Sequence, residues 1–174
     1  MIVDDVQVEN WPVHDWSEYD WHARAQSAVT AALTASPQAE LISTATTIEI
    51  SVRLTSDEEV KALNHQYRQR DQPTNVLSFP MVQPDLIGTL ANTDDGEVLL
   101  GDIVLAYGVC AREAAEKDVL LEDHATHLIV HGVLHLLGCD HMTDAEATAM
   151  EAIERAAMSA LGLHDPSQDS ENPE

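Results

Sequence analysis

The amino-acid sequence predicts an α+β fold, in which a small mixed sheet packs with about five helices in a single domain. The length of 174 residues is near the usual size of one domain and is enough to bury one hydrophobic core. Hydrophobic residues make up 44% of the chain, an ordinary value for a globular protein. Strand and helix patterns are mixed along the sequence, with the helices weighted toward the C-terminal half.

Strand patterns cover four segments, residues 2–8, 46–54, 76–79 and 98–106. In 46–54, apolar Ile, Val and Leu alternate with polar residues, which is typical of a strand with one buried face. Pro80 is expected to end the third strand, because proline has no N–H to donate to a sheet. Gly101 and Asp102 are expected to break the fourth strand.

Helical spacing of apolar residues covers five segments, residues 17–35, 57–68, 107–117, 122–137 and 143–162. Two of them begin with the spacing of a capping box, Ser56 with Glu59 and Thr143 with Glu146. Gly138 is a suitable residue to end the fourth helix. Residues 1–163 are therefore expected to form the domain, and the polar, acidic residues 164–174 a disordered tail.

The charge of the chain is strongly negative, with 31 Asp and Glu against 8 Lys and Arg and a net charge near −23. This balance argues against a general binder of polyanions, DNA included, and against docking on anionic membranes. Any phosphate site would have to be local and built from a few basic residues. No apolar run approaches the roughly 20 residues that span a bilayer, and no signal peptide is evident at the N-terminus. A cytoplasmic protein is expected, with Cys110 and Cys139 as free thiols.

Three histidines near the end of the fourth predicted helix form the most informative pattern. His131 and His135 are four residues apart, so they lie about 40° apart on one helix face and one turn apart in height. Two imidazoles placed in this way can grip one metal ion. Gly138 permits a sharp turn, after which His141 can supply a third ligand. The pattern predicts one divalent metal ion per chain.

Zinc is the metal that three neutral nitrogen ligands favour, although nickel, copper or iron would also suit them. A three-histidine zinc site leaves the fourth position open for water, which is the catalytic pattern rather than the structural one. His124 and His127 lie on the same side of the helix, earlier in the chain. They are expected to be solvated or partly buried, and the alternatives are contacts that support the metal ligands or touch substrate.

The spacing H-x-x-x-H-x-x-G-x-x-H is that of the metzincin metallopeptidases. Those enzymes need a glutamate directly after the first histidine as the base that activates water. Here the position is Gly132, which cannot accept a proton. The similarity therefore covers the metal ligands and not the peptidase chemistry.

A closer match depends on three blocks of the sequence. Residues 131–141 read H-G-V-L-H-L-L-G-C-D-H, and residues 63–80 contain Leu-Asn, Tyr-Arg and then Asp-Gln-Pro-Thr-Asn-Val-Leu-Ser-Phe-Pro. Residues 100–103 read Leu-Gly-Asp-Ile. In order and spacing these blocks resemble the YbeY family of bacterial rRNA-maturation factors, whose signature is H-G-x-L-H-L-x-G-x-D-H. The resemblance spans roughly residues 46 to 163 and is highly specific.

The resemblance implies a zincin-like α+β domain that holds Zn²⁺ on His131, His135 and His141. It implies a single-strand-specific, metal-dependent endoribonuclease that acts in 16S rRNA 3′-end maturation and ribosome quality control. The implied partners are rRNA and the small ribosomal subunit or its associated proteins. Arg68 falls at the family's important basic position.

Arg68 and Asp140 are the candidate catalytic residues beside the metal. An arginine fork can hold a phosphate bidentately, whereas a purely structural Arg68 would stabilise the C-terminal end of its helix. Asp140 precedes the third ligand and could orient a histidine or accept a proton, or could simply be a turn residue. The competing functions are a ribosome-assembly factor with a structural metal and, less favoured because of Gly132, a zinc peptidase-like hydrolase.

Overall fold

The four strands form one mixed sheet in the order β1-β2-β4-β3. The computed structural model describes residues 2–8, 11, 18–36, 47–68, 74–81, 97–138 and 143–163. The strands are β1 (Ile2–Val8), β2 (Thr47–Thr55), β3 (Val76–Pro80) and β4 (Glu97–Ala106). Strands β1, β2 and β4 run parallel, and β3 pairs with β4 in the antiparallel sense.

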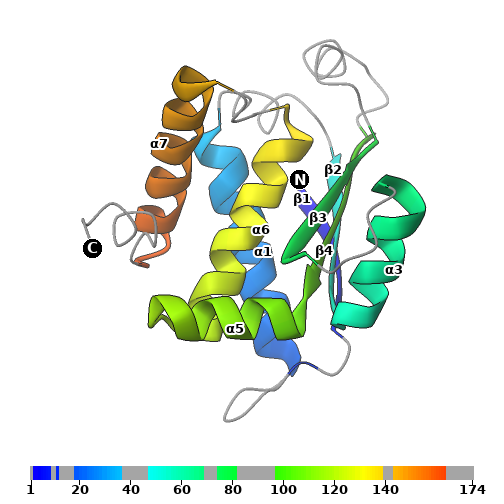
Figure 1. The fold of residues 1–174 in the computed structure, drawn as a ribbon. Coiled ribbons are helices and arrows are strands. Elements are labelled where there is room, and N and C mark those ends of the chain that lie inside the picture. The colour runs from blue at the N-terminus through cyan, green and yellow to red at the C-terminus, as the bar shows by residue number, and fades with distance from the viewer. Residues whose placement is uncertain are drawn as a thin grey trace.

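The described residues form five helices, which lie on both faces of the sheet (Figure 1). They are α1 (Glu18–Ala35), α3 (Asp57–Arg68), α5 (Tyr107–Lys117), α6 (Leu121–Leu136) and α7 (Asp144–Ala160). Helices α1 and α6 cover one face, with α7 packed outside them, and α3 covers the other face. The predicted α+β fold, with a small mixed sheet and about five helices, is confirmed. The predicted tail, residues 164–174, lies outside the described residues.

Two groups of buried side chains fill the spaces between the sheet and its helices. The larger group includes Ile48, Ile50 and Leu54 of β2, all fully buried, as their alternation in the sequence predicts. The smaller group lies beneath α3 and includes Val60, Leu77 and Val104. None of the helices in the described part of the chain has the length and apolar character that a bilayer crossing requires.

The capping boxes differ in completeness. At the start of α7, the Thr143 side chain accepts a hydrogen bond from the Glu146 N–H and the Glu146 side chain accepts one from the Thr143 N–H, as predicted. At the start of α3, Ser56 Oγ accepts from the Glu59 N–H. The Glu59 carboxylate instead accepts a hydrogen bond from Thr55 and pairs with Arg53.

Strand β4 corrects one prediction, because Gly101 and Asp102 do not break it. Glu49 pairs with Leu99 and Ile50 pairs with Gly101, so Leu100 is an extra residue that forms a bulge in a continuous strand. Leu100 is fully buried in the larger group of core residues. Pro80 ends β3 as predicted: it is the last residue of the strand, opposite Gly101, where proline is tolerated at the end of an edge strand.

Gly101→Ala is expected to destabilise the protein strongly. Gly101 has a φ of +149°, and a Cβ atom there would lie 2.3 Å from the backbone oxygen of Phe79. Overpacking of this kind typically costs roughly 1–3 kcal/mol, and the strained backbone adds to it. Gly162→Ala is the matched control, since φ is +73° there but no atom lies within 4 Å of the added Cβ. Chemical denaturation should show the larger loss at Gly101; equal losses would mean that the contact with β3 is unimportant.

Candidate metal centre

Helix α6 brings His131 and His135 together on one face, as their spacing predicts. The two Nε2 atoms lie 2.9 Å apart, and the ring centroids are separated by 4.5 Å. The His131 side chain is 28% exposed, so the pair is accessible from outside. Between the two histidines, Gly132 lies against β4, where an added Cβ would come within 3.0 Å of Ile103. Glycine at this position allows the helix backbone to pack closely on the sheet.

The arrangement of the histidine pair fits a metal ion. Two histidine nitrogens bound to one zinc, each at about 2.0–2.1 Å in tetrahedral geometry, lie roughly 3.3 Å apart. The two Nε2 atoms are already near that separation and need to part by only a few tenths of an ångström. His141, the predicted third ligand, lies outside the described residues, together with Asp140 and Cys139. Within the described ranges, no group of three His, Cys, Asp or Glu could hold a metal ion, so the full ligand set stays a prediction.

A buried carboxylate supports the histidine pair from α7. Glu154 is only 5% exposed, and its Oε1 atom accepts a hydrogen bond from Nδ1 of His131. Its Oε2 atom faces Nε2 of His127 at 3.4 Å. Burial alone would raise the pKa of Glu154, but the hydrogen bonds from His127 and His131 outweigh it and lower the pKa to about 2. The carboxylate is therefore ionised at neutral pH.

Glu154 is not among the site residues predicted from the sequence, although the sequence does contain a signal. Met150, Ala157 and Met158 are buried and occupy one face of α7 at helical spacing. Glu154 interrupts this apolar face, and a charged residue in such a position needs a partner. The partner could not be identified from the sequence, because it lies on a different helix.

His124 lies on α6 but has a different environment from the His131–His135 pair. It is 1% exposed, and its Nε2 atom lies 2.9 Å from Oε1 of Glu113 on α5. The same carboxylate oxygen accepts a hydrogen bond from the side chain of Asn75, just before β3. Burial lowers the pKa of His124 below its ordinary value. His124 therefore joins α5, α6 and the start of β3 and does not contact His131 or His135.

The remaining candidate residues are placed only in part. Arg68 is the last residue of α3, but its side chain lies outside the described residues. Cys110 is a buried free thiol, and burial, together with the nearby carboxylates of Glu113 and Asp57, raises its pKa to about 12. A thiol with so high a pKa is unreactive at neutral pH.

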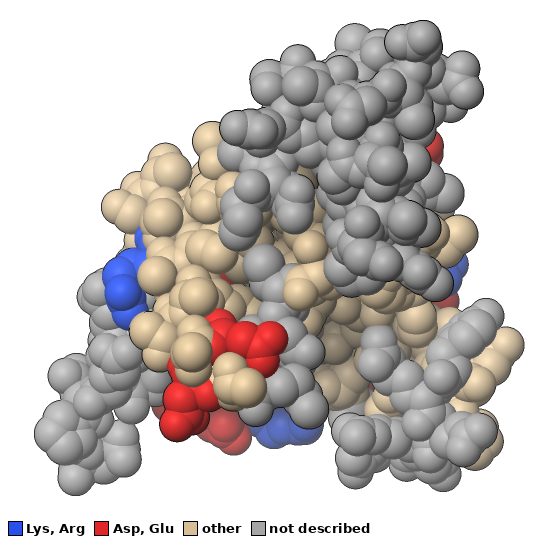
Figure 2. Space-filling view, turned by 90° about the horizontal axis from the view of Figure 1, so that it is seen from above, with Lys and Arg blue, Asp and Glu red and all other residues tan. Residues whose placement is uncertain are grey.

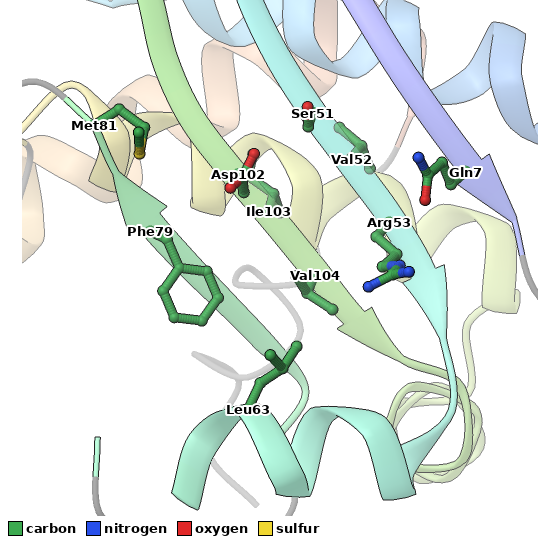
Figure 3. Close-up of a pocket in the computed structure, with 10 residues that line it drawn as sticks. All are labelled: Gln7, Ser51, Val52, Arg53, Leu63, Phe79, Met81, Asp102, Ile103 and Val104. Atoms are coloured by element: carbon green, nitrogen blue, oxygen red, sulfur yellow. The ribbon is translucent and has the colours of Figure 1, made fainter. Parts of the chain in front are cut away.

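A groove of about 510 Å³ lies on the same face of the sheet as α3 and is lined in part by Leu63 of that helix (Figure 3). Figure 3 shows Ser51, Arg53 and Asp102 projecting into it from β2 and β4. The C-terminal end of α6 points upward in Figure 1, so Figure 2 views the molecule from that end. On this face the largest group of described acidic side chains lies at the lower left of Figure 2, and the basic ones lie toward the edge.

The fold and the histidine pair together define a class of protein, an α+β domain with two histidines one helical turn apart and suited to one metal ion. The chain belongs to the YbeY family: the sequence model of the family described as Endoribonuclease YbeY matches residues 13–162. This match begins well before residue 46, so it includes more of the N-terminal region than the three motif blocks indicated.

Individual relatives agree with this assignment. A protein of Rhizorhabdus wittichii named Endoribonuclease YbeY is 63% identical over 153 residues, which cover 87% of this chain and 90% of that protein. A protein of Sphingopyxis alaskensis with the same name is 56% identical over 167 residues, which cover 95% of this chain and 99% of that protein. The solution structure of TM1509 from Thermotoga maritima has a TM-score of 0.56 at 20% identity and covers 99% of each chain. At that identity the last comparison supports the fold alone.

Proposed function

We propose that this protein is a metal-dependent endoribonuclease that cleaves single-stranded RNA in 16S rRNA 3′-end maturation and ribosome quality control. The observation that carries the proposal is the accessible His131–His135 pair, supported by a buried carboxylate, in a chain 63% identical to a protein named Endoribonuclease YbeY. The expected partners are rRNA and the small ribosomal subunit or its associated proteins, in the cytoplasm.

The proposed ligands are His131, His135 and His141, with Zn²⁺ as the metal. When bound, the ion supplies a Lewis acid for a phosphoryl oxygen and lowers the pKa of a bound water. Arg68 would hold the scissile phosphate or its neighbour through its guanidinium fork. Asp140 would orient a ligand or accept a proton. A few positioned groups of this kind can bind RNA locally in a chain whose net charge is −23.

The environment of Gly132 argues against peptidase chemistry. The residue carries no base, and the space beside its Cα is taken by Ile103 of β4. The Cβ atom of a glutamate at this position would lie 3.0 Å from the Ile103 side chain, which would have to shift to make room. The structural reason for glycine here is therefore close packing of α6 on β4.

Purified wild-type protein is expected to cleave a single-stranded RNA, to cleave the same sequence poorly as a duplex, and to lose the activity in a chelator. His135→Ala, purified in the same way, should be inactive, because the variant lacks one of the proposed ligands. The products can be resolved on a denaturing gel. Equal cleavage by wild type and His135→Ala would point to a contaminating nuclease and contradict the proposal. A wild type that is inactive but fully loaded with metal would favour an assembly factor with a structural metal.

A further inference from the structure

We propose that Glu154 is the positioning residue of the metal centre, that it fixes the ring and the tautomer of His131, and that His127 holds its carboxylate in place. This inference rests on the metal centre of the proposed function. It depends on one contact in particular, because Glu154 meets Nδ1 of His131, the ring nitrogen that does not face His135. Glu154 therefore acts through His131 and is not itself a ligand.

The chemistry of imidazole determines which partner donates the hydrogen bond between His131 and Glu154. A neutral histidine has one N–H and one nitrogen lone pair, and an ionised carboxylate can only accept hydrogen bonds. With Glu154 at Nδ1, the proton of His131 must stay on Nδ1, so Nε2 keeps the lone pair with which it can bind a metal. Without the carboxylate both tautomers become available, and the one with a proton on Nε2 cannot bind. The contact also prevents the ring from turning away from His135.

Both oxygens of the carboxylate are used, which explains how its position is held. Oε1 accepts from His131, and Oε2 faces Nε2 of His127 at 3.4 Å. The His127 and His131 rings lie one turn apart on α6, with centroids separated by 6.5 Å. A carboxylate that is 5% exposed is costly to bury without such partners. Glu154 thus links α7 to two successive turns of α6.

The protein offers an internal control of the same chemistry. Glu113 and His124 form a second carboxylate–histidine pair between α5 and α6, with a separation of 2.9 Å. His124 does not contact either proposed ligand described here, and its Nδ1 atom has no hydrogen-bond partner among the described residues. A purely structural role for Glu154 would make the two pairs equivalent. If Glu154 is a positioning residue, loss of the Glu154–His131 pair should weaken metal binding, and loss of the Glu113–His124 pair should not.

The first test is zinc affinity, measured on the full chain by competition with a chromogenic chelator. Glu154→Ala should weaken zinc binding by roughly 10–100-fold, the usual effect of losing a partner of a metal ligand. Glu154→Gln should fall between it and wild type, because its amide oxygen can still accept from Nδ1. Glu113→Gln and the exposed Glu151→Gln, also on α7, should bind zinc like wild type. Affinities within twofold of wild type for both Glu154 variants would overturn the proposal.

The second test is the protonation of His131 in the zinc-free protein, read by ¹⁵N-edited NMR of the imidazole rings. Wild type should carry the His131 proton on Nδ1, and Glu154→Gln should keep it there, whereas Glu154→Ala should show a mixture of tautomers. His127→Ala alone should bind zinc more weakly than wild type. The double variant His127→Ala with Glu154→Ala should bind zinc no more weakly than Glu154→Ala alone. If Glu154→Ala does not fold, the zinc affinity of Glu154→Gln relative to wild type tests the proposal on its own.

Neither measurement uses RNA, so failure of the proposed nuclease activity leaves this test intact. A wild type that bound no zinc would refute the metal centre, and an unchanged His131 tautomer in Glu154→Ala would refute the role of Glu154.

Discussion

His131→Ala and His135→Ala are each expected to remove nearly all of the metal that we propose the chain binds. The two Nε2 atoms lie 2.9 Å apart and can bind the same ion, so removal of either leaves a site with a missing ligand. The loss of affinity should exceed the roughly 10–100-fold typical of supporting partners. Because bound metal stabilises the folded state, the melting temperature should also fall. Elemental analysis after dialysis measures the first effect, and thermal unfolding the second.

Three further variants make the metal experiment specific. His65→Ala removes an exposed histidine from α3 and should keep full metal content and melting temperature. His124→Ala should lower stability, since it breaks the buried contact with Glu113, but should also keep the metal. His141→Ala should behave like His131→Ala if His141 is the third ligand. Full metal content in His141→Ala would exclude His141 from the ligand set.

Arg68→Ala is expected to lower RNA cleavage by roughly 10–100-fold, because a charge-assisted hydrogen bond to phosphate is worth about 1.5–3 kcal/mol. Metal content and melting temperature should stay near wild type, since an arginine does not bind a cation. Arg68→Lys should recover only part of the activity, because an ammonium keeps the charge and loses the planar fork. Rates at saturating and limiting RNA, with metal content measured on the same samples, separate these effects.

The matched control for Arg68 is Arg112→Ala, which removes an exposed arginine from α5 and should leave cleavage unchanged. If Arg68 serves only the end of α3, its removal should cost about 0.3–1 kcal/mol of stability and little activity. Wild-type cleavage by Arg68→Ala would leave the phosphate contact without support. A similar loss in Arg112→Ala would show that general charge, and not a particular contact, controls RNA binding.

Local patterns predicted most of the fold. The alternation in residues 46–54 and the capping box of Thr143 and Glu146 are short-range features, and the structure confirms both β2 and the start of α7. The bulge at Leu100 was not predicted, because a bulge depends on the register with β2 and not on β4 alone. A glycine within a strand pattern predicts a break, whereas Gly101 in the folded strand allows close contact with the backbone of Phe79.

The candidate site also combines features that local sequence predicts with features that depend on long-range packing. His131 and His135 were predicted because they are neighbours on one helix, and the geometry of a helix fixes their spacing. Glu154 was missed because its contact with His131 depends on how α7 packs against α6. The roles of Arg68, Asp140 and His141 remain predictions, which the variants above address.

The order of the strands along the chain has a consequence for folding during synthesis on the ribosome. Val6 of β1 pairs with Val52 of β2, and Val52 pairs with Ile103 of β4, so each parallel pair must wait for a distant segment to be synthesised. Helices α6 and α7, which carry the histidines and Glu154, follow the whole sheet in the chain. A growing chain therefore contains all four strands before the supported histidine pair exists. Truncated products that end before α6 would contain the four strands but none of the proposed metal ligands.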